Sequence, residues 1–279
     1  MSKYQLGMNG GIEMNCGLAE EVAIIDKLGY DYIELRNWKV DEFLKEHSFE
    51  DLRALMDGVK VKPLSVNGIY PMNLVSSSDL ERLWLHAAWN IQLTAASGCP
   101  YVVACCFGGP EGLSLDEGRR QITEGLKLVS DLAAKFDVKV AYEPLGNKSY
   151  PIHTVADTME LLQTVDRDNV GWLLDVYHFH TVDDSLEALA ASDVDKLYLV
   201  HFDDVKDLPY ERLTGLDQRA FPGDGVSDLK GILSTLYRIG YKGPFSVELF
   251  NKELASWDPY EFATVVKQKA EAVLDKYFK

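Results

Sequence analysis

The stretch Val170-Gly171-Trp172-Leu173-Leu174-Asp175 is a short, almost uninterrupted apolar run that ends in a carboxylate. Runs of this kind are typical of strands in a parallel sheet that is buried on both faces. Leu197-Tyr198-Leu199-Val200 is a second example, and similar runs recur along the whole chain. Eight candidate strands result: Tyr4–Asn9, Tyr30–Arg36, Lys62–Asn67, Tyr101–Cys106, Val138–Glu143, Val170–Asp175, Leu197–Phe202 and Pro244–Leu249.

The segments between these strands carry helical patterns. Asp258 followed by Pro259 is typical of a helix N-cap and a first-turn proline. One face of an earlier helix, which Gly29 ends, is marked by Leu18, Val22, Ile25 and Leu28. Strands that alternate with helices over 279 residues predict a single (β/α)8 TIM barrel as the one domain, residues 1–279. No G-x-G-x-x-G motif follows the first strand, which disfavours a dinucleotide-binding fold.

Composition narrows the partners that the chain can have. Acidic residues exceed basic ones, 44 against 28, so the net charge is −16 and nucleic acid is disfavoured as a partner. No apolar stretch approaches the ~18 residues of a membrane span. The four cysteines lack C-x-x-C spacing, so we expect a cytoplasmic protein without a disulfide framework. The chain also has aromatic residues that could form an interface or a lid, although core packing is commoner for such side chains, so a homo-oligomer is left open: Trp38, Tyr70, Trp84 and Trp89.

The last four candidate strands each end on a residue that can bind a metal ion: Glu143, Asp175, His201 and Glu248. The chemistry of such barrels lies at the carboxyl ends of the strands. Three carboxylates that converge there without a cation would repel one another and lose their hydration. A set of oxygen ligands with one imidazole suits Mn²⁺, Zn²⁺, Co²⁺ or Mg²⁺. We therefore predict a site for one divalent metal ion.

Two further residues accompany this set. His178 follows Asp175 by three positions, so we expect it in a loop just above the sixth strand. Arg219 stands before the turn Pro222–Gly225, at the end of a long insertion after the seventh strand. A guanidinium held by such a turn can offer planar donors to substrate oxygens or to a carboxylate. The glycines and the proline can equally serve only to shape a surface loop.

The sequence resembles the xylose-isomerase-like TIM barrel superfamily and, within it, the inosose isomerase (2-keto-myo-inositol isomerase) family. The resemblance extends over nearly the whole chain. It is densest in residues 29–36 (GYDYIELR), 47–52 (HSFEDL) and 166–171 (DRDNVG), and it continues through 174–180 (LDVYHFH), the turn 219–225 and 245–250 (FSVELF). The ligands at the strand ends are common to the superfamily, whereas the D-x-x-H-x-H stretch and the insertion before Arg219 are more specific to the inosose isomerases.

The resemblance implies a set of roles. It makes Glu143, Asp175, His201 and Glu248 the ligands of a single metal ion, and Glu143 and Glu248 also the pair that transfers the proton. His178 and Arg219 would then bind substrate hydroxyls. Four further polar or thiol residues lie at strand ends and could line the pocket, but the resemblance assigns them no role: Asn9, Arg36, Asn67 and Cys106.

The reaction expected from this site is a metal-dependent proton transfer through an ene-diolate, the isomerisation of a keto-polyol or ketose. For an inosose isomerase it interconverts 2-keto-myo-inositol and 1-keto-D-chiro-inositol in inositol catabolism. The same residues would also serve a ketose 3-epimerase, a hydroxypyruvate isomerase, an inosose dehydratase or a 3-keto-glycoside lyase. The apurinic endonuclease branch needs additional histidines where this chain has Asn67 and Cys105-Cys106. The remaining class is non-enzymatic: a metal-bound sugar sensor or a subunit that needs a partner. A pure binder, however, gains nothing from a proton-transfer pair.

Overall fold

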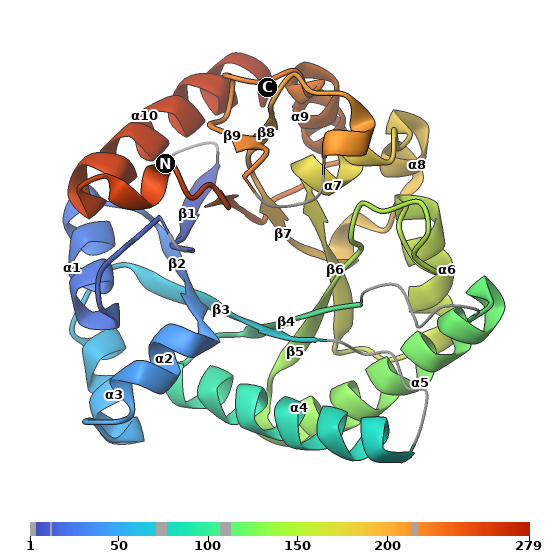
Figure 1. The fold of residues 1–279 in the computed structure, drawn as a ribbon, viewed down its shortest axis with the longest axis horizontal. Helices are drawn as coiled ribbons and strands as arrows, with labels where there is room; N and C mark the ends of the chain where they lie inside the picture. Colours follow the sequence, from blue (N-terminus) through green and yellow to red (C-terminus); the bar gives the residue numbers. More distant parts are fainter. Residues whose placement is uncertain (1–3, 12, 71–76, 107–112, 214–216) are drawn as a thin grey trace.

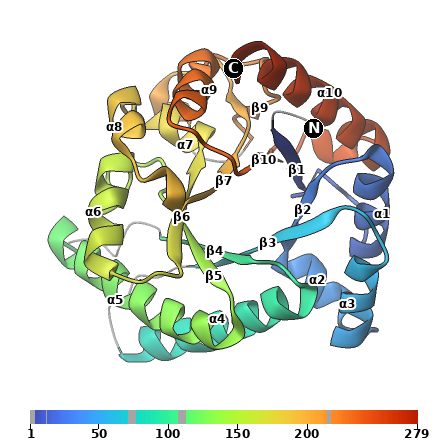
Figure 2. The same ribbon diagram turned by 180° about the vertical axis from the view of Figure 1, so that it is seen from behind.

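The computed structural model describes residues 4–279 apart from residues 12, 71–76, 107–112 and 214–216. Eight parallel strands close into a barrel, and helices surround it (Figure 1). Viewed from the opposite face, the strands enclose the same central space (Figure 2). The predicted (β/α)8 barrel is therefore confirmed. Its strands, in barrel order, are β1 (Gln5–Asn9), β10 (Pro244–Glu248), β7 (Leu197–His201), β6 (Val170–Asp175), β5 (Lys139–Glu143), β4 (Tyr101–Cys105), β3 (Lys62–Ile69) and β2 (Tyr32–Arg36).

The helices run along the outside of the barrel and cover its strands (Figures 1 and 2). Several of them begin at a side-chain cap; at the start of the last helix, for example, the Asp258 side chain accepts from the backbone N–H of Glu261. Leu18, Val22 and Ile25 are buried on the first helix, as their spacing predicted. The helices are α1 (Leu18–Leu28), α2 (Asn37–Phe43), α3 (Phe49–Asp57), α4 (Ser77–Ser97), α5 (Leu115–Ala133), α6 (Val155–Val165), α7 (Val176–Thr181), α8 (Leu186–Ala191), α9 (Leu229–Arg238) and α10 (Pro259–Tyr277), with short 3₁₀ helices at Ala134–Phe136, Val194–Lys196, Tyr210–Arg212 and Leu254–Ser256.

Successive residues of each strand face alternately toward the surrounding helices and into the barrel. This alternation determines which residues lie at the functional site. Trp172 and Leu174 of β6 face outward and pack with the surrounding helices, whereas Leu173 faces into the barrel. The barrel interior is closed by an apolar cluster composed of Leu64, Val103, Ala141, Leu173, Tyr198 and Leu199. Residues two positions further along β5, β6 and β7 face the same way. They are Glu143, Asp175 and His201, which lie directly above this apolar floor.

Several expected boundaries differ from those observed. The strands begin or end within two residues of the predicted limits; β3 continues to Ile69, for example, and β7 stops at His201. His178 lies on α7, which begins immediately after β6, so the expected loop was wrong. Asp175 makes this possible as the N-cap of α7, because its Oδ1 accepts from the His178 backbone N–H at 2.9 Å.

The long insertion between β7 and α9 contains an antiparallel strand pair that the sequence did not predict, β8 (Asp204–Val205) and β9 (Arg219–Ala220). Asp204 holds the following turn in place. Its carboxylate accepts from the backbone N–H groups of Gly223 at 3.1 Å, Gly225 at 3.0 Å and Ser227 at 2.9 Å. The β8–β9 pair and the turn that Asp204 fixes together place Arg219 at the mouth of the barrel.

Among the described residues, no helix combines the length and the apolar character that a membrane crossing requires.

Candidate metal centre

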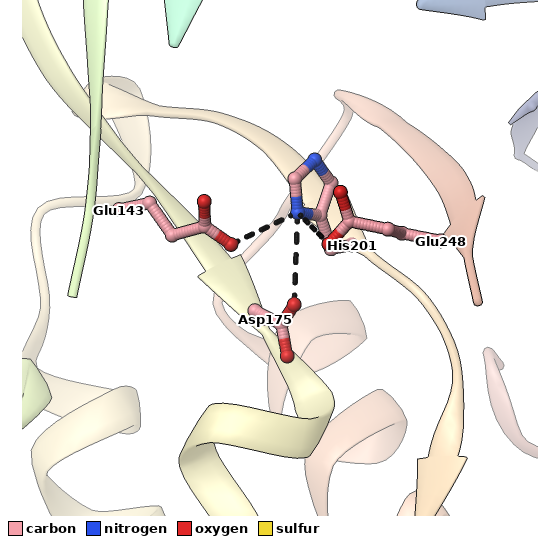
Figure 3. A group of neighbouring side chains, drawn as sticks. All are labelled: Glu143, Asp175, His201 and Glu248. Atoms are coloured by element: carbon pink, nitrogen blue, oxygen red, sulfur yellow. Dashed lines mark hydrogen bonds and ion pairs between the residues drawn. The ribbon is translucent and has the colours of Figure 1, made fainter. Parts of the chain in front are cut away.

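Glu143, Asp175, His201 and Glu248 meet at the mouth of the barrel, each at the carboxyl end of its strand (Figure 3). All four are buried, and each offers a ligand atom that lies within 4.8 Å of the ligand atoms of the others. The strands β5, β6, β7 and β10 that carry them are consecutive in the barrel order β10-β7-β6-β5. The four residues predicted as metal ligands are thus brought together by the fold.

The imidazole Nδ1 of His201 is the centre of the group. It lies 3.0 Å from Glu143 Oε1, 3.1 Å from Glu248 Oε2 and 3.6 Å from Asp175 Oδ2. One nitrogen with a single hydrogen can serve one acceptor well, so three converging carboxylate oxygens exceed what it can satisfy. Three oxygens and one imidazole nitrogen instead match the donor set of a divalent transition-metal or magnesium ion. The chemistry of the group therefore fits a metal ion.

The carboxylates in this group differ in their electrostatic surroundings. Burial raises the pKa of Glu143 to about 7, and the nearby His201 only partly opposes the rise. Burial acts in the same direction on Glu248, but His201 and Arg36 outweigh it and hold its pKa well below the usual range. Arg219 has the same effect on Asp175, whose pKa is also held well below the usual range despite burial. The two glutamates therefore have environments that push their pKa values apart.

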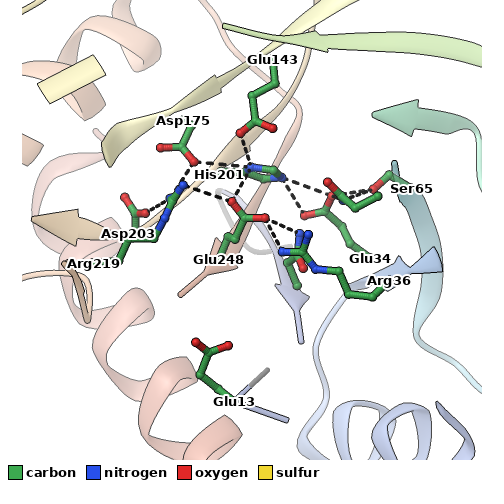
Figure 4. A network of polar contacts seen from close by, with 12 residues as sticks. Glu13, Glu34, Arg36, Ser65, Glu143, Asp175, His201, Asp203, Arg219 and Glu248 are labelled. Atoms are coloured by element: carbon green, nitrogen blue, oxygen red, sulfur yellow. Dashed lines mark hydrogen bonds and ion pairs between the residues drawn. The ribbon is translucent and has the colours of Figure 1, made fainter. Parts of the chain in front are cut away.

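Cations and amides around the ligands produce this difference (Figure 4). Arg36 Nη2 donates to Glu248 Oε1 at 2.5 Å, and Asn9 Nδ2 donates to the same oxygen at 3.0 Å. Both residues were predicted only as strand-end residues without a role. Each of them orients Glu248, and the Arg36 guanidinium also stacks over the Phe250 ring at 4.6 Å.

Arg219 is more deeply buried than a residue at the end of a surface loop would be, with 2% of its surface exposed. Its Nη1 donates to Asp175 Oδ2 at 2.7 Å and also to Asp203. Its Nη2 lies 3.4 Å from His178 Nε2 and 3.4 Å from Glu248 Oε2. Arg219 and His178 are therefore in contact with each other at the site, and Arg219 connects two of the candidate ligands.

A cavity of about 590 Å³ opens above the group, and His178, Arg219, Glu143 and Glu248 contribute to its wall. Aromatic residues also line it, namely Trp38, Tyr70, Tyr150, Tyr177 and Phe250. Apolar faces combined with a few convergent polar groups are typical of small-molecule sites.

Two of the strand-end residues without an assigned role, Arg36 and Asn67, line this cavity. Cys106 is buried in the apolar cluster outside the barrel, and its neighbour Cys105 lines the cavity in its place.

Two buried carboxylates beside the ligands were not anticipated from the sequence. Asp203 contacts Arg219, and Glu34 contacts His201 from the side opposite the candidate ligands (Figure 4). A signal for Glu34 exists in the sequence, because it stands two positions before Arg36 on one strand and must therefore face the same way. Asp203 also stands two positions from a candidate ligand, His201, but it lies beyond the end of β7, and its contact with Arg219 depends on the fold of the insertion.

A sequence model described as the xylose isomerase-like TIM barrel matches residues 22–274 of the chain. The chain belongs to this family.

Within the xylose isomerase-like family the chain is similar to proteins named inosose isomerase. The protein of that name from Halalkalibacterium halodurans is 32% identical over 265 residues, which cover 95% of this chain and 94% of the relative. The Bacillus subtilis (strain 168) protein of the same name is 33% identical over 265 residues, with 95% of each chain covered. A crystal structure described as the IOLI protein with a binding zinc atom superposes with a TM-score of 0.93 at 31% identity and covers 99% of both chains.

Proposed function

We infer that this protein is a divalent-metal-dependent inosose isomerase of inositol catabolism, which interconverts 2-keto-myo-inositol and 1-keto-D-chiro-inositol. The observation that carries this inference is the position of Glu143 and Glu248, which approach the same His201 nitrogen at 3.0 and 3.1 Å beneath the cavity. A substrate held there would have a carboxylate on either side of it. The curated relatives named inosose isomerase, aligned over 95% of the chain, support the choice of substrate.

We assign the four residues of the candidate metal centre as ligands of the ion. A divalent ion supplies Lewis acidity, which polarises the substrate carbonyl and acidifies the adjoining C–H group. The zinc described for the IOLI protein supports a divalent ion of this class in this chain as well. Mn²⁺, Co²⁺ and Mg²⁺ are compatible with the same donors.

The proton transfer is assigned to the two glutamates, because their surroundings differ in the way that an acid and a base require. Arg36 and Asn9 hold Glu248 as a carboxylate through Oε1, so Oε2 is assigned the proton from the carbon next to the carbonyl. Among the described residues no arginine contacts Glu143, which approaches His201 from the other side and is assigned the delivery of a proton to the adjacent carbon. The interconversion also moves the hydroxyl proton from one of the two adjacent oxygens to the other, directly or through water. Glu248 then passes its proton to water and Glu143 takes one up, which restores both side chains.

We assign His178 and Arg219 the binding of substrate hydroxyls. His178 Nε2 and Arg219 Nη2 are 3.4 Å apart on the cavity wall, so a single hydroxyl can contact both. The aromatic residues of the wall supply apolar faces for the C–H groups of a polyol ring. The burial of the four candidate ligands keeps bulk water away from the transferred proton.

We also propose that the enzyme acts in the cytoplasm on a small keto-polyol, without a nucleic-acid or membrane partner. No disulfide joins any of the four cysteines, all of which are described, and this agrees with a reducing compartment. The net charge of −16 opposes binding to phosphate backbones. Trp38, Trp84 and Trp89 are exposed on α2 and α4, so the homo-oligomer that the sequence left open stays a prediction.

The test is to incubate the purified protein with 2-keto-myo-inositol in D₂O and to follow the proton spectrum with EDTA or with added Mn²⁺, Co²⁺ or Zn²⁺. Metal-dependent deuterium incorporation together with a new inosose supports the isomerase. Metal-dependent loss of water would replace it with a dehydratase that uses the same site. The absence of exchange with every metal would contradict both the substrate and the proton transfer.

A further inference from the structure

Glu34 is a buried carboxylate that none of the assigned roles uses. It lies on β2 with 0% of its surface exposed, and it faces His201 from the side opposite the candidate ligands (Figure 4). It is not among the residues that line the cavity, so a bound substrate would not touch it. A carboxylate in such a position needs compensating contacts, because an isolated buried charge is costly.

A shift of register between β2 and β3 sets the position of Glu34 relative to β3. The register pairs Ile33 with Pro63 but Glu34 with Ser65, so Leu64 is one extra residue on β3. Bulges of this kind re-aim side chains next to functional sites. Here the bulge sets Ser65 and Asn67 beside the carboxylate: Ser65 Oγ donates to Glu34 Oε2 at 2.5 Å and Asn67 Nδ2 donates to it at 2.8 Å.

These two donors hold the carboxylate against the second ring nitrogen of His201. His201 Nε2 lies 3.2 Å from Glu34 Oε1 and 3.3 Å from Glu34 Oε2, whereas Nδ1 faces the three carboxylates of the metal group. A neutral imidazole carries its proton on one nitrogen, and its partners select which one. A carboxylate on the Nε2 side favours the tautomer with Nε2–H. That tautomer leaves the Nδ1 lone pair free for a cation.

We propose that Glu34 is the positioning residue of the metal centre: it keeps the His201 proton on Nε2 and thereby presents Nδ1 as the metal ligand. This inference rests on the proposed metal site and adds a residue that acts through His201 rather than on the substrate. A carboxylate that orients a metal-binding histidine is a general device of metal sites. Strand β2 carries a second residue that orients a candidate ligand, because Arg36, two positions after Glu34, donates to Glu248.

A merely structural role for Glu34 predicts a different result from a positioning role. A structural role would lower the stability of the fold and leave the histidine tautomer and the metal affinity of the folded protein unchanged. A positioning role changes both. The tautomer can be read in the wild-type protein itself by long-range proton–nitrogen NMR on protein with ¹⁵N-labelled histidine, in which His201→Ala assigns the signals.

The experiment titrates metal-free protein with Zn²⁺ and compares Glu34→Gln, Ser65→Ala and wild type. Glu34→Gln keeps the shape and removes the ionised acceptor, so we expect zinc affinity to fall roughly 10–100-fold. Ser65→Ala removes one of the donors that hold Glu34, and we expect a smaller loss. Glu21→Gln is the matched control, because Glu21 is an equally buried carboxylate that pairs with Lys39 instead of a metal ligand. We expect this control to keep the zinc affinity of the wild type.

In the zinc-loaded wild type the expected signals are a metal-bound Nδ1 and a protonated Nε2. The proposal is overturned if Nε2 is the metal-bound nitrogen, or if folded Glu34→Gln binds zinc within twofold of the wild type. The wild-type spectrum and the zinc affinity of Ser65→Ala still test the proposal if Glu34→Gln does not fold. A failure of the metal site itself is recognised separately, because His201→Ala and Glu143→Gln would then also leave the zinc affinity unchanged.

Discussion

Arg36→Met removes the guanidinium that contacts Glu248 and keeps a side chain of similar length. Arg36 and Glu248 have 11% and 4% of their side chains exposed, so the change leaves a buried carboxylate without its nearest cation. Removing one partner of a buried pair costs ~3–5 kcal/mol. Asn9 at 3.0 Å and Arg219 at 3.4 Å still contact Glu248 in the variant, and these charge-assisted contacts offset part of that cost. We therefore expect Arg36→Met to lower the free energy of unfolding by about 2 kcal/mol at pH 7.

The loss should depend on pH in a defined direction. Because the folded-state pKa of Glu248 is held below its unfolded value, the ionised carboxylate stabilises the fold above the unfolded pKa of ~4.3. That contribution disappears as the pH falls toward the folded-state pKa. Without Arg36 the folded-state pKa of Glu248 rises toward its unfolded value. Arg36→Met therefore loses less free energy of unfolding than wild type when the pH falls. The free-energy difference between Arg36→Met and wild type should therefore narrow between pH 7 and pH ~3.5.

Urea unfolding with EDTA present, at several pH values, measures this difference. Arg53→Met is a suitable control, because the Arg53–Asp57 pair has 53% and 62% of its side chains exposed. An exposed pair contributes at most about 1 kcal/mol. A stabilising role for the Arg36–Glu248 pair is refuted if Arg36→Met costs no more than Arg53→Met at pH 7, or if its cost is the same at every pH.

Three more predictions concern the site and the floor beneath it. Glu143→Gln and Glu248→Gln should each abolish deuterium incorporation into the inosose while the protein stays folded by circular dichroism; wild-type exchange in both would contradict the acid–base pair. EDTA should remove activity, and Zn²⁺ at 100 times its dissociation constant should raise the free energy of unfolding by about 2.7 kcal/mol, as measured by urea unfolding. Leu173→Ala should destabilise the fold by ~2–5 kcal/mol, because Leu173 is fully buried in the apolar floor, and a cost below ~1 kcal/mol would show that the floor is loosely packed.

The barrel and the four convergent residues were predictable because their signals are local. A run such as Val170–Asp175 is buried along its whole length, so its apolar character reports the strand directly. A polar residue at the end of each such run is then predicted to lie at the mouth of the barrel. The errors in strand ends are small, and β3 was underestimated because its pairing with β4 shifts register between Asn67 and Ile69.

The contacts around the ligands were not predictable, because they depend on distant segments. Arg219 was expected to bind substrate, but its contacts with Asp175 and Asp203 depend on how β9 returns to the barrel. The partner of Glu34 is 167 positions away in the chain, and its orientation depends on a bulge that no periodicity reports. His178 was misplaced for a local reason, because Asp175 both ends β6 and caps α7.

The two-residue alternation above the apolar floor has a consequence for how such a chain can change in length. A one-residue insertion between Leu173 and Asp175, or between Leu199 and His201, would turn the ligand toward the helices and leave its neighbour in its place. A similar insertion in a helix or a surface loop would leave every ligand where it is. Insertions and deletions should therefore be tolerated between the strands and rejected within the last residues of β5, β6, β7 and β10. A scan of single-residue insertions with growth on inositol as the readout would map the metal centre without changing one of its atoms.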